Sequence, residues 1–290
     1  MYLPDTAHSF SLRFIRPINY PRGQEIRGQA YIRQTTPEVR HTWYNSERNP
    51  RDHANEKGIA IMDLLMLKDH PTVQISGKRF IIDTGSPVSF NYCGISSLEI
   101  NGVNYNVGNT PPCSKDDLDE LTGSNIDGLI GLDIIRMNGI TVDMENNFFE
   151  FSCDVEDGCS DSYCFISFDF FMGSYIVTND IFLGKKLNNA IIDTGAPIPY
   201  VSSRLIPFFE KSGEMYKDLS PSYGVLQGEL LYGDLFFDVG KQTVKRRIKV
   251  GQMPQILDLF GMFDAILGIT ALTDKRVTFD FANKVIGIKL

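Results

Sequence analysis

Short apolar runs that alternate with polar positions follow one another along the chain from about residue 60. Runs of this kind predict β-strands with one buried face, and pairs such as Ser76-Gly77 and Asn101-Gly102 predict the turns between them. The strands expected here are residues 61–67, 72–75, 79–83, 98–100, 103–107, 140–143 and 148–151. A short helix is predicted over residues 133–137, and helical patterns are otherwise few. The pattern therefore indicates a mostly β architecture.

The same series of elements returns further along the chain. The strands expected there are residues 175–182, 190–193, 224–232, 235–239, 245–250, 277–281 and 285–289. In both series a hairpin leads to an acidic turn, a middle of variable length follows, and an apolar stretch ending in glycine precedes the last hairpin. We therefore expect two similar lobes, residues 59–160 and 161–290, with the longer middle in the second.

Residues 1–58 differ from the rest of the chain. They are rich in Arg, Asn, Pro and His, and residues 35–57 show little apolar periodicity. Residues 9–15 and 25–33 alternate in character, which predicts two short strands before an exposed loop. An additional sheet element, a partner-binding arm and a removable pro-segment all agree with this composition.

Composition and charge narrow the functional classes. The 290 residues are 42% hydrophobic and 22% charged, with a net charge of −8, which argues against non-specific binding to nucleic acid. No apolar run approaches the length of a membrane span, and the first residues lack the basic segment and apolar core of a signal peptide. We therefore expect a cytoplasmic protein that binds neither nucleic acid nor membranes.

Histidine and cysteine usage limits the possible chemistry. All four histidines precede residue 71, so a Ser-His-Asp or Cys-His arrangement would have to take its base from the N-terminal part of the chain. The five cysteines include no Cys-x-x-Cys pair, and no histidine lies near Cys153–Cys164. We therefore expect no metal site and no cofactor, and any chemistry in the repeated part must rely on carboxylates.

One seven-residue motif occurs twice in the chain, with a single difference between the copies. Residues 81–87, Ile-Ile-Asp-Thr-Gly-Ser-Pro, return as residues 191–197, Ile-Ile-Asp-Thr-Gly-Ala-Pro. A single Asp-Thr-Gly is a weak signal, but two copies in the same apolar and proline context indicate two half-domains that each present one carboxylate. The candidate catalytic residues are Asp83 and Asp193, because two carboxylates brought together can activate water.

Each position of the motif has a structural role. The isoleucines form a buried strand at the base of the loop, and the threonine can bond to the backbone of the other copy. The glycine lets backbone amides reach the carboxylate, and the small residue after it leaves room for a substrate. The residues expected to support the two loops are Thr84, Gly85, Ser86, Thr194, Gly195 and Ala196.

The doubled Asp-Thr-Gly, followed downstream by Leu129-Ile130-Gly131 and Ile266-Leu267-Gly268, resembles the aspartic proteases. The resemblance covers about residues 60–290, and the chain looks like two retropepsin-like halves fused into a small pepsin-like pseudo-dimer. It implies a two-lobed acid-protease fold with β-barrel-like halves related by a pseudo-twofold axis. It also implies that each apolar-apolar-glycine stretch packs beneath its own loop.

The resemblance implies an activity as well. An aspartic endopeptidase would use Asp83 and Asp193, sharing one proton, to activate a water that attacks a peptide carbonyl. Its partner would be a peptide or protein substrate, with no metal or cofactor, and one chain would suffice to build the site as a monomer. Ser86 follows the first motif and Ala196 the second, so a serine hydroxyl donating to Asp83 would make Asp83 the more acidic member.

Proteases of this family cover the substrate with a β-hairpin flap. The longer middle of the second half offers such a hairpin near residues 219–225, with Ser222, Tyr223 and Gly224 as candidates for contact with substrate. In pepsin-like proteins the flap belongs to the N-terminal lobe, so this placement would be a departure. The alternative is an ordinary hairpin far from the site.

Two other functions stay open at this stage. The same fold could bind or inhibit peptides without turnover, an alternative favoured by the unusual N-terminal segment and the short middle of the first half. A carboxylate-based glycoside hydrolase would need a wide aromatic groove, but the single tryptophan, Trp43, lies outside the repeats. The separation of the two carboxylates in the folded protein discriminates between these functions.

Overall fold

The computed structural model describes residues 61–153, 163–183, 185–186, 189–220, 224–239, 242–255, 258 and 261–290. The segment 1–58, with its two expected strands, therefore lies outside the described residues. Both repeats belong to one compact unit, Glu47–Leu290. Among the described helices, none has the length and apolar character needed to cross a membrane.

The first repeat is built mainly from short strands. They are β1 (Ile61–Leu67), β2 (His70–Ile75), β3 (Lys78–Ile82), β4 (Phe90–Asn91), β5 (Ser97–Ile100), β6 (Val103–Asn106), β7 (Gly128–Ile130), β8 (Ile140–Asp143) and β9 (Phe148–Glu150). Its helices are α2 (Lys115–Thr122) and α3 (Leu132–Asn138). Helix α3 confirms the helix predicted over residues 133–137. The turn predicted at Asn101-Gly102 joins β5 to β6, and both of its residues have positive φ.

Helix α2 is not predicted by the sequence pattern. It buries only Leu118 and Thr122, so its apolar periodicity is too faint to stand out. Its ends nevertheless carry ordinary helix signals, because the Ser114 side chain accepts a hydrogen bond from the Asp117 N–H and Gly123 closes the helix in the left-handed conformation. Capping thus explains a helix that lacks an apolar stripe.

The second repeat follows the same order with a longer middle. Its strands are β10 (Tyr163–Ser167), β11 (Asp169–Phe171), β12 (Tyr175–Thr178), β13 (Phe182–Leu183), β14 (Lys185–Lys186), β15 (Ala190–Ile192), β16 (Tyr200–Val201), β17 (Glu210–Ser220), β18 (Gly224–Val239), β19 (Gln242–Gln252), β20 (Ala265–Leu267), β21 (Arg276–Asp280) and β22 (Val285–Lys289). A 3-10 turn, η1 (Ser203–Phe208), precedes β17, and the short helix α5 (Ile269–Leu272) follows β20.

The middle of the second repeat corrects two expectations. Strand β17 is absent from the prediction, because most of its described residues are polar and exposed. Strand β18 runs unbroken where the sequence predicts two strands, 224–232 and 235–239. Gly233, at the predicted break, lies directly against the ring of Phe209 within the strand, so the glycine serves a close approach and not a turn.

Six strands drawn from both repeats form the symmetric part of one sheet. Their order is β10-β22-β21-β8-β9-β1, which is unchanged when the two repeats are exchanged. At the centre β8 and β21 run antiparallel with Thr141 opposite Thr278, and the two hydroxyl oxygens are 3.1 Å apart. Because the two threonines hold equivalent places in their repeats, a pseudo-twofold axis passes between them.

The architecture is mostly β with two related lobes, as the sequence predicts. The expected barrel-like form of the halves is not found among the described strands. The sheets run in open order, β1-β2-β3-β7-β4 in the first half and β11-β12-β15-β20-β16 in the second. In the first half the sheet ends at β4, and beyond it the described residues add only an isolated bridge from Phe90 to Gly108.

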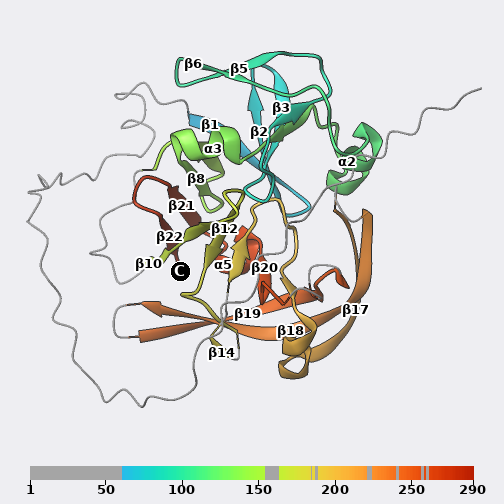
Figure 1. Cartoon of the computed structure of the whole chain (residues 1–290), viewed down its shortest axis with the longest axis vertical. Coiled ribbons are helices and arrows are strands. Elements are labelled where there is room, and N and C mark those ends of the chain that lie inside the picture. The colour runs from blue at the N-terminus through green and yellow to red at the C-terminus, as the bar shows by residue number, and fades with distance from the viewer. Residues whose placement is uncertain are drawn as a thin grey trace, which may run out of the picture. The chain divides into compact units, whose positions relative to one another are not determined.

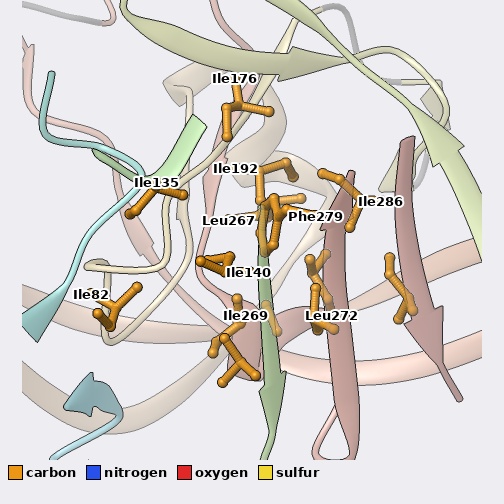
Figure 2. Close-up of a cluster of buried hydrophobic side chains, with 14 of the residues drawn as sticks. Ile82, Ile135, Ile140, Ile176, Ile192, Leu267, Ile269, Leu272, Phe279 and Ile286 are labelled. Carbon is orange, nitrogen blue, oxygen red and sulfur yellow. The ribbon is translucent and has the colours of Figure 1, made fainter. Parts of the chain in front are cut away.

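One hydrophobic core joins the two lobes beneath the repeated motifs. Figure 2 shows Ile82 and Ile192, which directly precede the motif aspartates, in the same cluster as Leu267 and Phe279. All four side chains are fully buried, and burial of each contributes roughly 1.5–3 kcal/mol. Apolar packing from both repeats therefore fixes the strands that lead into the two loops.

Candidate active site

The two motif loops are built in the same way. Strand β3 ends at Ile82 beside the parallel strand β7, and the N–H of Asp83 donates to the carbonyl of Ile130 at 2.9 Å. In the second repeat β15 lies parallel to β20, and the N–H of Asp193 donates to the carbonyl of Leu267 at 2.9 Å. Each aspartate is therefore held where a buried strand leaves its sheet.

The apolar-apolar-glycine stretches lie beneath their own loops, as expected. The N–H of Leu132, directly after Gly131, donates to the carbonyl of Ser86 at 2.9 Å. A Cβ added at Gly131 would lie 2.8 Å from that carbonyl oxygen, and one added at Gly268 would overlap the carbonyl of Ala196. The close approach of the loops thus requires glycine at both places.

Thr84 and Thr194 tie the two loops together. The backbone N–H of each donates to the hydroxyl of the other at 2.9 Å. The Thr84 hydroxyl donates to the carbonyl of Ile192 at 3.0 Å, and the Thr194 hydroxyl donates to the carbonyl of Ile82 at 2.7 Å. Both threonines are fully buried, so water does not compete for these four bonds. The cross-loop bonds expected from the sequence are therefore present.

Thr84→Val is expected to lower the free energy of unfolding by about 2–6 kcal/mol, since two buried groups lose their partners at about 1–3 kcal/mol each. Those groups are the Ile192 carbonyl and the Thr194 N–H. Urea unfolding followed by circular dichroism measures the loss. Thr84→Ser keeps the hydroxyl and is the matched control. Equal stability of the Val and Ser variants would contradict the role given to these bonds.

The carboxyl groups of Asp83 and Asp193 each lie against the glycine of the other loop. A Cβ added at Gly195 would be 2.5 Å from the Cγ of Asp83, and one added at Gly85 would overlap the carboxyl of Asp193. The two carboxyl groups are within hydrogen-bonding reach of each other. As whole residues, both aspartates are partly exposed.

Backbone donors distinguish the two aspartates. Oδ1 of Asp83 accepts hydrogen bonds from the N–H groups two and three residues further on, at 2.7 and 3.1 Å. Oδ1 of Asp193 accepts from the N–H of Gly195 at 2.9 Å, whereas the N–H of Ala196 donates to the main-chain carbonyl of Asp193. Since donors favour the ionised form, the loop geometry favours a negative charge on Asp83.

Burial raises the pKa of both carboxyls above the ordinary value of 3.8. For Asp83, hydrogen bonds with the Asp193 carboxyl and with two backbone N–H groups oppose the rise. For Asp193, the charge of Asp83 and the hydrogen bond with it add to the effect of burial, so the pKa of Asp193 is raised further. A proton shared by the pair therefore resides on Asp193 while Asp83 is ionised.

The cause predicted for this asymmetry is wrong. The Ser86 hydroxyl donates to the carbonyl of Val88 at 2.9 Å and not to Asp83. The backbone N–H of Ser86 donates to Oδ1 of Asp83, whereas the Ser86 hydroxyl forms its hydrogen bond within the turn that follows the motif. The predicted direction, with Asp83 the more acidic member, agrees with the pKa shifts. The cause is the pair of backbone N–H groups that donate to Asp83.

The raised pKa values predict how stability depends on pH. The folded protein holds the proton of Asp193 more tightly than the unfolded chain does, because the pKa of Asp193 is raised in the folded state. The proton therefore adds to the free energy of unfolding, and this addition is fully present at pH values below the ordinary pKa of 3.8. It is lost as the pH rises through the higher pKa of the folded state. The difference in Tm between the wild type and Asp193→Asn should therefore fall as pH rises, in thermal unfolding measured from pH 3.5 to 8. A difference that stays constant would contradict the raised pKa.

The ribbon formed by β17 and β18 reaches from the second repeat to the first. Lys217 on β17 donates to the Glu120 carboxylate of α2 at 2.8 Å, and the end of β17 lies near α2 (Figure 1). Of the residues expected to contact substrate, Ser222 and Tyr223 lie outside the described residues, and Gly224 begins β18. A hairpin is thus present at the predicted place, and its role as a flap stays a prediction.

A cavity of about 240 Å³ lies between this ribbon, α2 and the β1–β2 turn. Both repeats contribute to its lining, with Lys68, Glu120 and Leu121 from the first and Lys217, Asp218 and Val225 from the second. The Lys68 ammonium donates to the main-chain carbonyl of Glu120 at 2.9 Å. The cavity is therefore a mixed polar and apolar space at the junction of the two lobes.

Two residues near the pair carry no sequence signal of their own. The Tyr200 hydroxyl on β16 donates to the carboxylate of Asp218 on β17, and both side chains are buried. Tyr200 follows Asp193 at the same distance as Phe90 follows Asp83, so aligning the repeats reveals the extra hydroxyl. Asp218 meets it only through the folding of the ribbon, which no local pattern records.

Two further aspartates near the motifs, Asp127 and Asp264, have structural partners. Oδ2 of Asp127 accepts from the N–H of Arg79 at 2.9 Å, and the buried carboxylate of Asp264 accepts from Nε of Arg204 at 2.6 Å. The described part of the chain contains no group of three or more His, Cys, Asp or Glu side chains that could hold a metal ion.

No protein-family model matches the sequence, and no curated protein matches it. Among solved structures, the chain is similar to basic 7S globulin from soybean, with 10% sequence identity and a TM-score of 0.46. The similarity covers 80% of this chain and 94% of the globulin chain.

Proposed function

We propose that this protein is an aspartic endopeptidase with Asp83 and Asp193 as its catalytic pair. The observation that carries the proposal is the meeting of the two carboxyl groups within hydrogen-bonding reach. Buried threonine bonds hold their loops together, and both aspartates are partly exposed as whole residues. Two carboxylates this close resist simultaneous ionisation, so the pair keeps one proton over a range of pH.

Asp83 acts as the base and Asp193 as the acid. Ionised Asp83 takes a proton from a water molecule between the carboxyls while the water oxygen attacks the peptide carbonyl carbon. Protonated Asp193 donates its proton to the carbonyl oxygen, which gives a tetrahedral diol. Asp193 then recovers a proton from that diol, and Asp83 passes its own to the leaving nitrogen as the C–N bond breaks. The pair thereby returns to its starting state.

An extended peptide is the substrate form that suits this site. The β17–β18 ribbon joins the first repeat through the ion pair between Lys217 and Glu120, whose side chains are 62% and 73% exposed. An ion pair so exposed contributes little to stability, so the contact between the ribbon and α2 can open for a substrate at little cost. We therefore assign the ribbon the role of a cover for the peptide.

Incubation of the pure protein with a denatured protein substrate between pH 3 and 7 tests the proposal. New peptide termini, identified by mass spectrometry, are expected to appear from wild-type protein. Binding of a peptide without any new termini would identify a non-catalytic peptide-binding module and would contradict the proposed activity. The two carboxyl groups lie closer together than the carboxyl pair of a glycoside hydrolase, so the geometry does not favour glycoside hydrolysis.

A further inference from the structure

The two motif loops differ in what lies beneath them. In the first repeat the Ser89 hydroxyl donates to Oδ1 of Asp133 at 2.6 Å and accepts from the N–H of Gly131 at 2.9 Å. Ser89 is only 3% exposed, so water competes little for these bonds. Because the hydroxyl donates one bond and accepts another, its orientation is fixed, and with it the position of the Gly131 backbone.

The Gly131 backbone in turn supports the first loop. A Cβ added at Gly131 would lie 2.8 Å from the Ser86 carbonyl oxygen, so backbone and loop are in close contact. The next N–H along the chain, that of Leu132, donates to the same carbonyl at 2.9 Å. The N–H of Ser86 donates to Oδ1 of Asp83 at 3.1 Å. A continuous series of hydrogen bonds and packing contacts therefore runs from the start of α3 to the Asp83 carboxylate.

The second repeat lacks this support. When the repeats are aligned on their motifs, Pro199 holds the place of Ser89 and Thr270 that of Asp133. Proline has no hydroxyl, so the hydrogen bonds that Ser89 makes have no counterpart. The N–H of Ala196 donates to the main-chain carbonyl of its motif aspartate, whose carboxylate accepts from one backbone N–H instead of two. The additional donor thus occurs in the loop that has the additional support.

The charged groups around the first loop are few. Asp193 meets Asp83 from the second loop, and Asp133 lies beneath it in the first turn of α3. The other charged side chain of α3, Arg136, is exposed, and β7, beside the strand that leads to Asp83, carries no charged side chain. The negative charge of Asp133 alone would raise the proton affinity of a nearby carboxylate. Asp133 can therefore favour ionised Asp83 only through hydrogen bonds and the position of the loop.

We propose that Ser89 and Asp133 are positioning residues that hold the first loop where Ser86 donates its N–H to Asp83, which makes Asp83 the ionised member of the pair. The inference rests on the proposed function, in which ionised Asp83 takes a proton from the attacking water. A backbone donor favours the ionised form of the carboxylate that it contacts. Without the support, Asp83 should keep a proton at pH values where the wild type has lost it.

The test uses Ser89→Ala, which removes both bonds of the hydroxyl without changing any charge. The readout is the pH midpoint of the Asp83 carboxyl resonance in the full chain, labelled with ¹³C at its aspartate carboxyl carbons and assigned by its loss in Asp83→Asn. We expect the midpoint to move to higher pH by about half a unit to one unit, as a hydrogen bond to a carboxylate weakens. Below the midpoint, kcat for peptide cleavage should fall about three- to tenfold with KM unchanged, because the ionised fraction of Asp83 falls by that factor.

Two control variants separate positioning from charge and from stability. Asp133→Asn removes the charge but keeps an oxygen that can accept the Ser89 hydroxyl, so the Asp83 midpoint should not rise. Thr122→Val removes a buried hydroxyl that donates to the Leu118 carbonyl within α2. It should lower Tm and leave the midpoint unchanged. A rise in Thr122→Val as well would show a general effect of lost stability and would overturn the inference.

An unmoved midpoint in Ser89→Ala would also overturn the inference, because a purely structural role would lower Tm without moving the midpoint. If Ser89→Ala fails to fold, Asp133→Ala replaces it, since this variant leaves the bond between Ser89 and Gly131 in place. Loss of the Asp133 charge alone would lower the midpoint, so only a rise supports the inference and any other result overturns it. Because the resonance does not depend on turnover, a raised midpoint without peptide cleavage would refute only the proposed activity.

Discussion

Asp83→Asn and Asp193→Asn are each expected to lower kcat/KM for peptide cleavage by about 10³-fold or more, at every pH between 3 and 7. Asparagine keeps the size of the side chain but can neither accept a proton from water nor donate one to the carbonyl oxygen. Each variant therefore removes one of the two proton transfers on which bond cleavage depends. Initial rates on a fluorogenic peptide, chosen from the cleavage sites found in the denatured substrate, measure the effect.

Asp63→Asn is the matched control for these variants. Asp63 is exposed on β1, so the same chemical change occurs away from the two motif loops. Its rate should equal that of the wild type. Cleavage by either variant of the pair at more than about a tenth of the wild-type rate would contradict the assigned chemistry, because general acid–base catalysis contributes about 10²–10⁴-fold.

Gly85→Ala and Gly195→Ala are each expected to lower the rate of peptide cleavage about 10²-fold. A displacement of about 1 Å in a reacting group can reduce a catalytic rate by that factor. Each added methyl group would fall on the carboxyl of the opposite aspartate, Asp193 for Gly85 and Asp83 for Gly195. The carboxyl must move, and the pair loses the geometry in which one water contacts both groups. Peptide cleavage rates measure the effect.

Gly108→Ala is the control for these glycine variants. Gly108, like Gly85 and Gly195, has no positive φ. A Cβ added at Gly108 would lie 3.3 Å from the Ser89 carbonyl oxygen, a contact that a small shift can relieve. Its activity should stay within about twofold of wild type, because a Cβ at this position would not touch either catalytic carboxyl. Near-normal activity in Gly85→Ala would show that the carboxyls do not need their observed positions.

Much of the motif geometry can be predicted from the sequence because the chain repeats it. Two copies of Ile-Ile-Asp-Thr-Gly, each followed by apolar-apolar-glycine, predict two buried strands with an exposed turn and a close approach underneath. The parallel pairing of β3 with β7 and of β15 with β20 follows this expectation. The last hairpins of the two repeats share a further feature. Asn146 and Asn283 each donate a backbone N–H to the aspartate three residues before, Asp143 and Asp280.

Contacts between distant segments could not be predicted in the same way. The ribbon strand β17 is polar and exposed along most of its described length, so its pairing with β18 leaves no apolar pattern. The Ser86 hydroxyl could reach either Asp83 or Val88, and only the path of the loop decides between them. The contact of Tyr200 with Asp218 depends on how the whole ribbon packs. Local sequence carries the motif, whereas the surroundings that adjust its proton affinity arise from tertiary structure.

A carboxyl titration tests the central claim most directly. The protein is labelled with ¹³C at its aspartate carboxyl carbons, and the resonances of Asp83 and Asp193 are assigned by their loss in the two asparagine variants. We predict that both resonances move together in one coupled step at a pH well above the ordinary pKa of 3.8, as one proton leaves the pair. Two independent titrations, each centred near 3.8, would show that the aspartates hold no common proton and would contradict the account.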